Sequence, residues 1–149
     1  MQELDGSVLE GGGQVLRNAI ALSTLLGTPV SIKNIRAGRA KPGLHHQHLT
    51  GLQLVAQLCD ATVTGDTIGS SSVSFSPGTL KHGRYEADTK TAGSICLLIQ
   101  IALPCLLFSP SPASVVVLRG GTNCDMAPHV PSMSPSRLRL ILFLYRLTI

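Results

Sequence analysis

The residues best suited to chemistry lie in one segment rich in glycine and cations, from Ile35 to Leu49. Arg36 and Arg39 stand three residues apart within it, close enough to donate paired hydrogen bonds to the oxygens of one phosphate. No acidic residue occurs between positions 11 and 59, although that stretch contains three further cations, Arg17, Lys33 and Lys41. A basic zone without neighbouring carboxylates predicts phosphate binding, and a solvated charged loop is the alternative interpretation.

A second unusual segment contains three consecutive glycines, Gly11 to Gly13, between an expected strand and an expected helix. Glycines let backbone N–H groups approach an anion, and a helix N-terminus adds partial positive charge. The segment lacks the Lys-Ser/Thr pair of a P-loop and does not fit G-x-G-x-x-G, so taken alone it is better explained as a tight turn. Glu10, just before the glycines, carries the oxygen ligands that suit magnesium or manganese, and a solvated carboxylate is the alternative.

Three histidines, His45, His46 and His48, fall within one helical turn. They cannot all converge on one metal ion, and no carboxylate or cysteine is near them in the sequence, which disfavours a metal site. His48 follows Gln47 and is better interpreted as a polar contact at the start of a helix. Any of the three could exchange a proton near neutral pH, but their spacing favours none of them.

Two further segments could contact a ligand. Gln100 is the one polar side chain in the apolar run from Ile95 to Phe108, and a buried amide requires hydrogen-bond partners. Gly120 to Asn123 follows an expected strand, and with Pro128 nearby it could form one wall of a nucleotide pocket. A backbone partner for the amide and an ordinary β-turn are the plainer alternatives.

The composition narrows the class of protein. The 149 residues are 44% hydrophobic and 13% charged, which predicts one globular domain rather than a disordered chain. Aromatic residues make up 3% and tryptophan is absent, which disfavours an aromatic platform for bare bases. The net charge of +4 depends on three arginines that follow the last acidic residue, and without them nine cations face eight anions. The local basic zone is therefore stronger evidence for an anionic partner than the total charge.

The four cysteines form no C-x-x-C pair, so a zinc ribbon or a thioredoxin-like site is not expected, and a reducing intracellular compartment fits best. The N-terminus shows no signal-peptide pattern. The apolar run from Ile95 to Phe108 is interrupted by Gln100 and Pro104 and is too short to span a bilayer, so no membrane partner is expected.

The hydrophobic pattern of the first 77 residues predicts the order β-α-β-α-β-β. A short strand precedes Asp5, and a helix runs from the glycines to Leu26, with a buried face made by Val15, Ala19, Leu22 and Leu26. The remaining expected elements are a strand at 30–33, a helix at 49–59 and strands at 61–64 and 72–75.

The pattern then begins again. A strand is expected at 85–87, a largely buried helix at 91–108 and a strand at 114–118. Ala92 to Ser94 opens this helix much as the three glycines open the first one, which indicates a repeated structural unit. The domain is expected over 1–130, with unit one at about 1–77 and a partial unit two at about 78–130. Residues 131–149 form a divergent tail, first Pro/Ser-rich and then apolar with arginines, which could be an edge strand or a helix.

Taken in order, these segments resemble the RNA 3′-terminal phosphate cyclases over residues 4–130. The matching pieces are Asp5-Gly6, Glu10 to Arg17, Ile35 to Leu44, Gln47 to Leu49, Ala92 to Ser94, Gln100, Pro104, Gly120 to Asn123 and Ala127-Pro128. The resemblance implies an α+β fold with α/β two-layer packing, built from repeated βαβαββ units. This chain would then hold one complete unit and part of a second.

The resemblance also implies an ATP-dependent ligase of RNA processing that acts on RNA with a 3′-phosphate end. The enzyme is adenylylated on a histidine with release of diphosphate, and AMP then passes to the RNA 3′-phosphate. The neighbouring 2′-hydroxyl attacks, which gives a 2′,3′-cyclic phosphate and releases AMP. ATP and a divalent cation, magnesium or manganese, are the implied cofactors, the nucleus is the implied location, and no DNA specificity is expected.

The resemblance also implies roles for individual residues that occupy matching positions in the family motifs. Gln100 and Pro128 match residues that line the ATP site, and Glu10 matches a carboxylate near the metal. Four residues match groups that face phosphates or the RNA end, namely Arg17, Arg36, Arg39 and Gln47.

The sequence departs from the family pattern in several places. Family members run well over twice this length, and the histidine that accepts AMP lies near their C-terminus. None of the five histidines here matches it, so no catalytic residue is assigned, and we expect these 149 residues alone not to cyclise RNA. A small inserted domain and the 131–149 tail also find no match.

Two alternatives remain. The first is a non-catalytic cyclase-like protein of ribosomal RNA processing, which the intact segments Glu10 to Arg17 and Arg36 to Gln47 disfavour. The second is a non-enzymatic fragment that binds RNA or anions.

Overall fold

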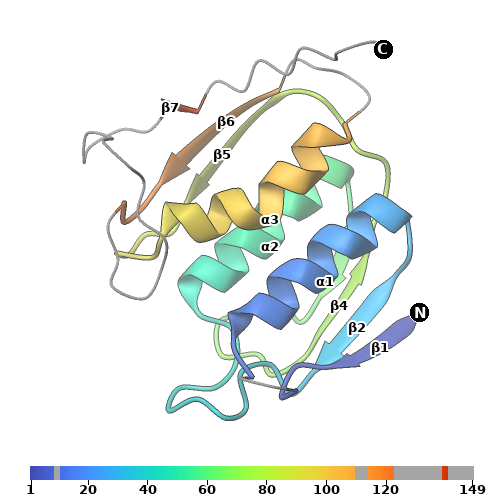
Figure 1. The fold of residues 1–149 in the computed structure, drawn as a ribbon, viewed down its shortest axis with the longest axis vertical. Coiled ribbons are helices and arrows are strands. Elements are labelled where there is room, and N and C mark those ends of the chain that lie inside the picture. The colour runs from blue at the N-terminus through green and yellow to red at the C-terminus, as the bar shows by residue number, and fades with distance from the viewer. Residues whose placement is uncertain (9–10, 110–113, 123–138, 141–149) are drawn as a thin grey trace.

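The computed structural model describes residues 1–8, 11–109, 114–122 and 139–140. Three helices run side by side in front of a four-stranded sheet, and a second, smaller sheet flanks α2 and α3 (Figure 1). This arrangement confirms the expected α+β class with helices and sheets in separate layers. Glu10 and Pro128, as well as most of the tail, lie outside the described residues.

The first sheet has the strand order β1-β2-β4-β3. Strands β1 and β2 are parallel, with Gln2 opposite Val30, and β4 runs antiparallel to both β2 and β3. The elements of this unit are β1 (Gln2–Asp5), α1 (Gly13–Leu26), β2 (Val30–Lys33), α2 (His46–Cys59), β3 (Thr62–Thr64) and β4 (Val73–Ser76). The predicted order β-α-β-α-β-β is therefore confirmed, with α2 starting three residues before the expected position.

The second unit repeats the opening of the first. Strand β5 (Arg84–Asp88) and strand β6 (Val115–Arg119) are parallel and are connected through α3 (Ile95–Leu107), as β1 and β2 are through α1. Strand β7 (Arg139–Leu140) pairs antiparallel with β6, so this part of the tail forms an edge strand. The expected repeat is thus visible as a second β-α-β crossover.

The predicted buried face of α1 is right for Ala19, which is buried, but wrong for Leu22 and Leu26. Leu22 is 55% exposed and Leu26 is 72% exposed, whereas Leu16, Ile20 and Thr24 are buried. Apolar residues cover most of the circumference of this helix, so spacing alone fits two different faces. Contacts with α2 and α3 select the face that lies one residue further along the chain.

The core lies between the helices and the first sheet. Phe75 of β4 and Ile32 of β2 are almost fully buried, as are the helix residues that face them. In the helix layer, Gly51 of α2 leaves room for Ile101 and Leu98 of α3, which approach its backbone closely. The helices therefore pack tightly enough to fix the positions of their N-terminal ends relative to one another.

Cys59 and Cys105 are fully buried in the core. Burial raises the pKa of both thiols, that of Cys105 to about 12, so neither is a reactive thiolate.

Among the helices of the described residues, none has the length and hydrophobicity needed to cross a bilayer.

Two loops that are distant in sequence are held together at one end of the molecule. The N–H of Gly69 donates to the carbonyl of Leu44 at 2.8 Å, and the N–H of Leu44 donates to the carbonyl of Ser70 at 3.0 Å. Gly43 has φ +78°, and a Cβ atom there would collide with the backbone of Gly69. Glycine at 43 thus permits both the turn and the close contact between the loops.

We expect Gly43→Ala to lower the free energy of unfolding by about 2–4 kcal/mol, because the left-handed backbone and the collision with Gly69 both oppose a side chain. Gly38→Ala is the matched control in the same loop, since its φ is not positive and no atom lies near its Cβ position. Urea unfolding measures both variants. Equal stabilities would contradict the tight contact between the loops.

Candidate anion-binding site

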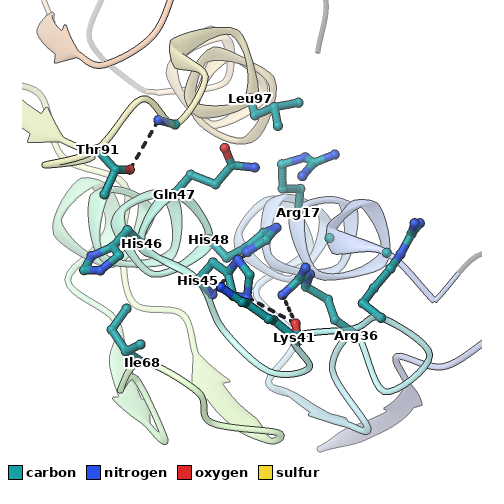
Figure 2. Close-up of a pocket in the computed structure, with 14 residues that line it drawn as sticks. Arg17, Arg36, Lys41, His45, His46, Gln47, His48, Ile68, Thr91 and Leu97 are labelled. Atoms are coloured by element: carbon teal, nitrogen blue, oxygen red, sulfur yellow. Dashed lines mark hydrogen bonds between the residues drawn. The ribbon is translucent and has the colours of Figure 1, made fainter. Parts of the chain in front are cut away.

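A pocket of about 650 Å³ opens where the N-terminal ends of the three helices meet (Figure 2). Each helix, together with the two loops, contributes residues to it. These are Gly12, Gly13 and Arg17 from the start of α1, Arg36, Arg39 and Lys41 from the loop before α2, His45 to His48 at the start of α2, Ile68 from the second loop, and Thr91, Gly93 and Leu97 at the start of α3. This size is in the range of pockets that bind small organic ligands.

The structure brings four of the predicted site residues into this one pocket, namely Arg17, Arg36, Arg39 and Gln47. Gln100 lies beside it, because its side chain contacts Arg17. Glu10 and Pro128 are outside the described residues, so their predicted roles stay predictions. The binding roles of the four pocket residues also stay predictions, although their shared location is now established.

Arg17 projects from the second turn of α1 and is held by a residue from α3. Its Nε donates a hydrogen bond to Oε1 of Gln100 at 2.9 Å. Burial lowers the pKa of the guanidinium, but an arginine remains charged at any physiological pH. The hydrogen bond fixes the direction of the guanidinium, and Nη1 lies close to Gly13, another residue of the pocket lining. Gln100 therefore positions Arg17, whatever else its amide contacts.

Arg36 stabilises its own loop as well as lining the pocket. Its Nη1 donates to the carbonyl of Lys41 at 2.7 Å and to the carbonyl of Gly43 at 2.9 Å. His45 assists, because its Nε2 lies 3.1 Å from the same Lys41 carbonyl and can only donate to it. The prediction that Arg36 and Arg39 bind phosphate oxygens stays a prediction, and Arg36 has a structural role as well. Part of the donor capacity of Arg36 closes the loop.

His48 is a neutral, buried imidazole at the centre of the site. It is 7% exposed. Burial first, and the charges of Arg36, Arg17 and His45 after it, lower its pKa to about 4. Its Nδ1 accepts the backbone N–H of His45 at 3.3 Å, which leaves the proton on Nε2. The prediction that His48 makes a polar contact at a helix start is confirmed.

Gln47 links the starts of α2 and α3. Its Oε1 accepts the backbone N–H of Ser94 at 3.1 Å, which is the residue just before α3. Because the oxygen is used in this way, the side-chain NH2 group is the part of Gln47 that can donate to a ligand. The predicted role of Gln47 at an RNA end is compatible with this second, structural role.

The electrostatics of the pocket favour an anion. Helices α1 and α3 start without a side-chain cap, and none of the three has an acidic residue in its first turn. No carboxylate lines the pocket among the residues that the structure describes. Helix N-termini and desolvated guanidiniums both stabilise negative charge, and here neighbouring acids do not neutralise them. The arrangement can bind a multiply charged anion such as a phosphate.

A divalent cation does not fit this set of side chains. Within the described ranges, no group of three or more His, Cys, Asp or Glu side chains could hold a metal ion. The guanidiniums would also repel a cation that was not already bound to a phosphate. A metal role for Glu10 therefore stays a prediction from the sequence.

Three residues of the pocket lining were not predicted from the sequence, and two others had no predicted role. Ile68, Thr91 and Leu97 line the pocket from segments that carry no recognisable ligand pattern. Only the alignment of Ala92 to Ser94 with the first glycine segment could have indicated the start of α3. The spacing of the histidines assigns no role to His45 or His46, yet both line the pocket.

Stability should depend on pH through His48. Its pKa is lowered to about 4 in the folded protein from an ordinary value of 6.5, so between these pH values the unfolded chain binds a proton that the folded chain excludes. The free energy of unfolding should therefore fall as pH drops through this window, by roughly 3 kcal/mol in all. Denaturant titrations from pH 7.5 to 4 of the native chain and of His48→Gln measure the effect, and the variant should show a flatter profile. His82→Gln, at an exposed residue outside the pocket, is the control. Identical profiles for the native chain and His48→Gln would contradict the buried neutral imidazole.

Comparison with known proteins identifies the family. The family model for RNA 3′-terminal phosphate cyclase matches residues 8–142. An RNA 3′-terminal phosphate cyclase of Drosophila melanogaster is 52% identical over 133 residues, which are 89% of this chain and 37% of that protein. A probable RNA 3′-terminal phosphate cyclase of Dictyostelium discoideum is 51% identical over 85% of this chain and 30% of that protein. The cyclase of Pyrobaculum aerophilum is 52% identical over 87% of this chain and 37% of that protein. The chain thus spans a little over a third of most of these relatives, and it belongs to the RNA 3′-terminal phosphate cyclase family.

Proposed function

We propose that the pocket at the helix N-termini binds the 3′-phosphate end of RNA, as part of an ATP-dependent conversion of that end to a 2′,3′-cyclic phosphate. One observation carries the proposal above all others. Arg17 of α1 and the two loop residues Arg36 and Arg39 face one cavity in which the described residues place no carboxylate. The family membership supports the choice of an RNA end among the anions that such a pocket could bind.

The positive charge of the pocket favours a terminal phosphate over an internal one. A terminal phosphate monoester carries close to two negative charges at neutral pH, whereas an internal diester carries one. A site with several cations and open helix N-termini gains more from the dianion. The neutral Nε2–H of His48 adds a donor that does not depend on pH above the lowered pKa of this residue.

The family resemblance supplies the reaction, and the described residues supply the electrostatics. ATP provides an AMP group that becomes attached to the RNA 3′-phosphate. The 2′-oxygen then bonds to that phosphorus, the hydroxyl proton leaves, and the bond from phosphorus to AMP breaks. Negative charge grows on the phosphate oxygens in this step, and the guanidiniums of the pocket would stabilise it without moving. We place this chemistry in the nucleus, on the family resemblance alone.

A non-enzymatic RNA-binding protein is the second candidate. The same pocket would serve it, and the described residues include no assigned catalytic group. It differs in one measurable respect, because general RNA binding does not require a 3′-phosphate.

We expect the 149-residue chain to bind a short RNA with a 3′-phosphate at least about tenfold more tightly than the same RNA with a 3′-hydroxyl, because a charge-assisted contact contributes roughly 1.5–3 kcal/mol. Arg39→Ala should reduce this preference and lower the salt slope of binding by about 0.7. Fluorescence anisotropy at several salt concentrations measures both quantities. Arg84→Ala, on an exposed strand residue outside the pocket, is the matched control and should keep the preference. Equal affinity for the two RNA ends would favour the non-enzymatic candidate.

The expectation that these 149 residues do not cyclise RNA by themselves has a direct test. The chain is incubated with radiolabelled ATP, a divalent cation and a 3′-phosphorylated RNA. We expect neither a protein–AMP adduct nor a cyclic end, because none of the five histidines matches the family residue that accepts AMP. A stable adduct on this chain would overturn that expectation.

A further inference from the structure

The pocket has two unlike sides. Arg17 and Arg36 lie on one side of it in Figure 2, and His46 and Ile68 lie on the opposite side. The first side carries the charge, whereas the second presents an aliphatic side chain and an imidazole ring. A cavity of about 650 Å³ is also far larger than one phosphate group requires. The cavity therefore has room for an uncharged part of a ligand beside its anionic part.

Ile68 is an unusual residue at this position. It is 50% exposed, although it borders a pocket made mainly of polar and charged groups. An exposed isoleucine on a surface is ordinary by itself, but one that lines a ligand-sized cavity offers apolar area for a ligand to cover. His46, the first residue of α2, is exposed beside the same cavity.

The position of Ile68 is fixed by the backbone on both sides of it. Gly69, the next residue, donates its N–H to the carbonyl of Leu44 at 2.8 Å, and Ser70 accepts the N–H of Leu44 at 3.0 Å. The N–H of Ser70 also bonds to the carbonyl of Thr67 at 3.1 Å. Leu44 stands two residues before His46, so these bonds tie the Ile68 loop to the start of α2. A contact surface held in this way loses little entropy when a ligand binds.

We infer that Ile68 and His46 form a contact surface for the terminal nucleoside of an RNA whose 3′-phosphate lies among the cations, an inference that rests on the proposed function. A nucleotide is divided in the same way as the pocket, into an anionic phosphate and a flat, uncharged base. Bases pack on imidazole rings and on apolar side chains when they leave a stack. Ile68 has no hydrogen-bonding group, so its contact with a base reads no base edge and accepts all four bases.

The test compares three RNAs in anisotropy titrations of the full 149-residue chain. They share one sequence and end in a normal nucleotide with a 3′-phosphate, in an abasic ribose with a 3′-phosphate, or in a normal nucleotide with a 3′-hydroxyl. We expect the native chain to bind the first RNA about fivefold more tightly than the second, which corresponds to burial of the exposed half of an isoleucine. Exchange of the terminal base among the four should change affinity by less than about threefold.

Three variants separate the base contact from other effects. Ile68→Ser should abolish the preference for the base-bearing end but keep the preference for 3′-phosphate over 3′-hydroxyl. Ile68→Leu preserves the apolar area and should keep both preferences. Leu26→Ser is the matched control, because Leu26 is 72% exposed on the last turn of α1 and lies outside the pocket lining. Thermal unfolding of each variant checks that the fold is unchanged.

The outcomes distinguish this inference from the proposed function. If the native chain prefers 3′-phosphate but binds the abasic and normal ends equally, the nucleoside surface is wrong and the proposed function stands. If 3′-phosphate gives no preference, the proposed function fails and this inference fails with it. If Ile68→Ser instead weakens binding of ATP and leaves the RNA preferences unchanged, the surface contacts a free nucleotide, which overturns the assignment to the RNA end.

Discussion

The site depends on the way the first turn of α2 fits between the starts of the other two helices. His48 occupies the space that a side chain at Gly13 would take. A Cβ atom added at Gly93 would lie 2.9 Å from the Cβ atom of Gln47. Neighbouring side chains therefore leave no room for a Cβ atom at Gly13 or Gly93. With these contacts in place, the three helix starts converge, and every cation of the pocket faces a common cavity. Any larger residue at 13 would separate α1 from α2 and open the site.

This convergence concentrates like charges, which opposes folding in the absence of a ligand. Burial, and after it repulsion from Arg39, lower the pKa of Arg36, and burial lowers that of Arg17, so both groups are poorly solvated in their charged forms. Their partners are neutral oxygens, the amide of Gln100 for Arg17 and two backbone carbonyls for Arg36. Such partners orient a guanidinium without neutralising it. A bound phosphate would supply the missing negative charge, so ligand binding should stabilise the fold.

The helices and strands could be predicted from the sequence, but the contacts that each site residue makes could not. The apolar run predicts α3, although this helix begins at Ile95 and not at the expected residue 91. Strand β2 follows from the alternation at 30–33. The buried face of α1 does not, because Val15 with Leu22 and Leu16 with Ile20 are equally good stripes until α2 and α3 are placed. In the same way, Arg36 and Gln47 carry obvious ligand chemistry, yet their partners lie on other segments of the chain. Ile68 carries no signal at all, since its place beside His46 is set by hydrogen bonds between two loops.

The repeated β-α-β unit uses its two helix starts differently, and this asymmetry indicates where the phosphate lies. At the start of α3, the N–H of Ser94 bonds to Gln47 and the N–H of Ile95 bonds to the carbonyl of Gly121 at 3.0 Å. Those donors are therefore already used and serve to attach the second unit. The start of α1 has no side-chain cap, and Arg17 from its second turn and the Nε2–H of His48 lie beside it. Among the described residues, open donors and positive charge coincide at the start of α1, so the anion should lie nearest to α1, where Gln100 of the second unit also holds Arg17.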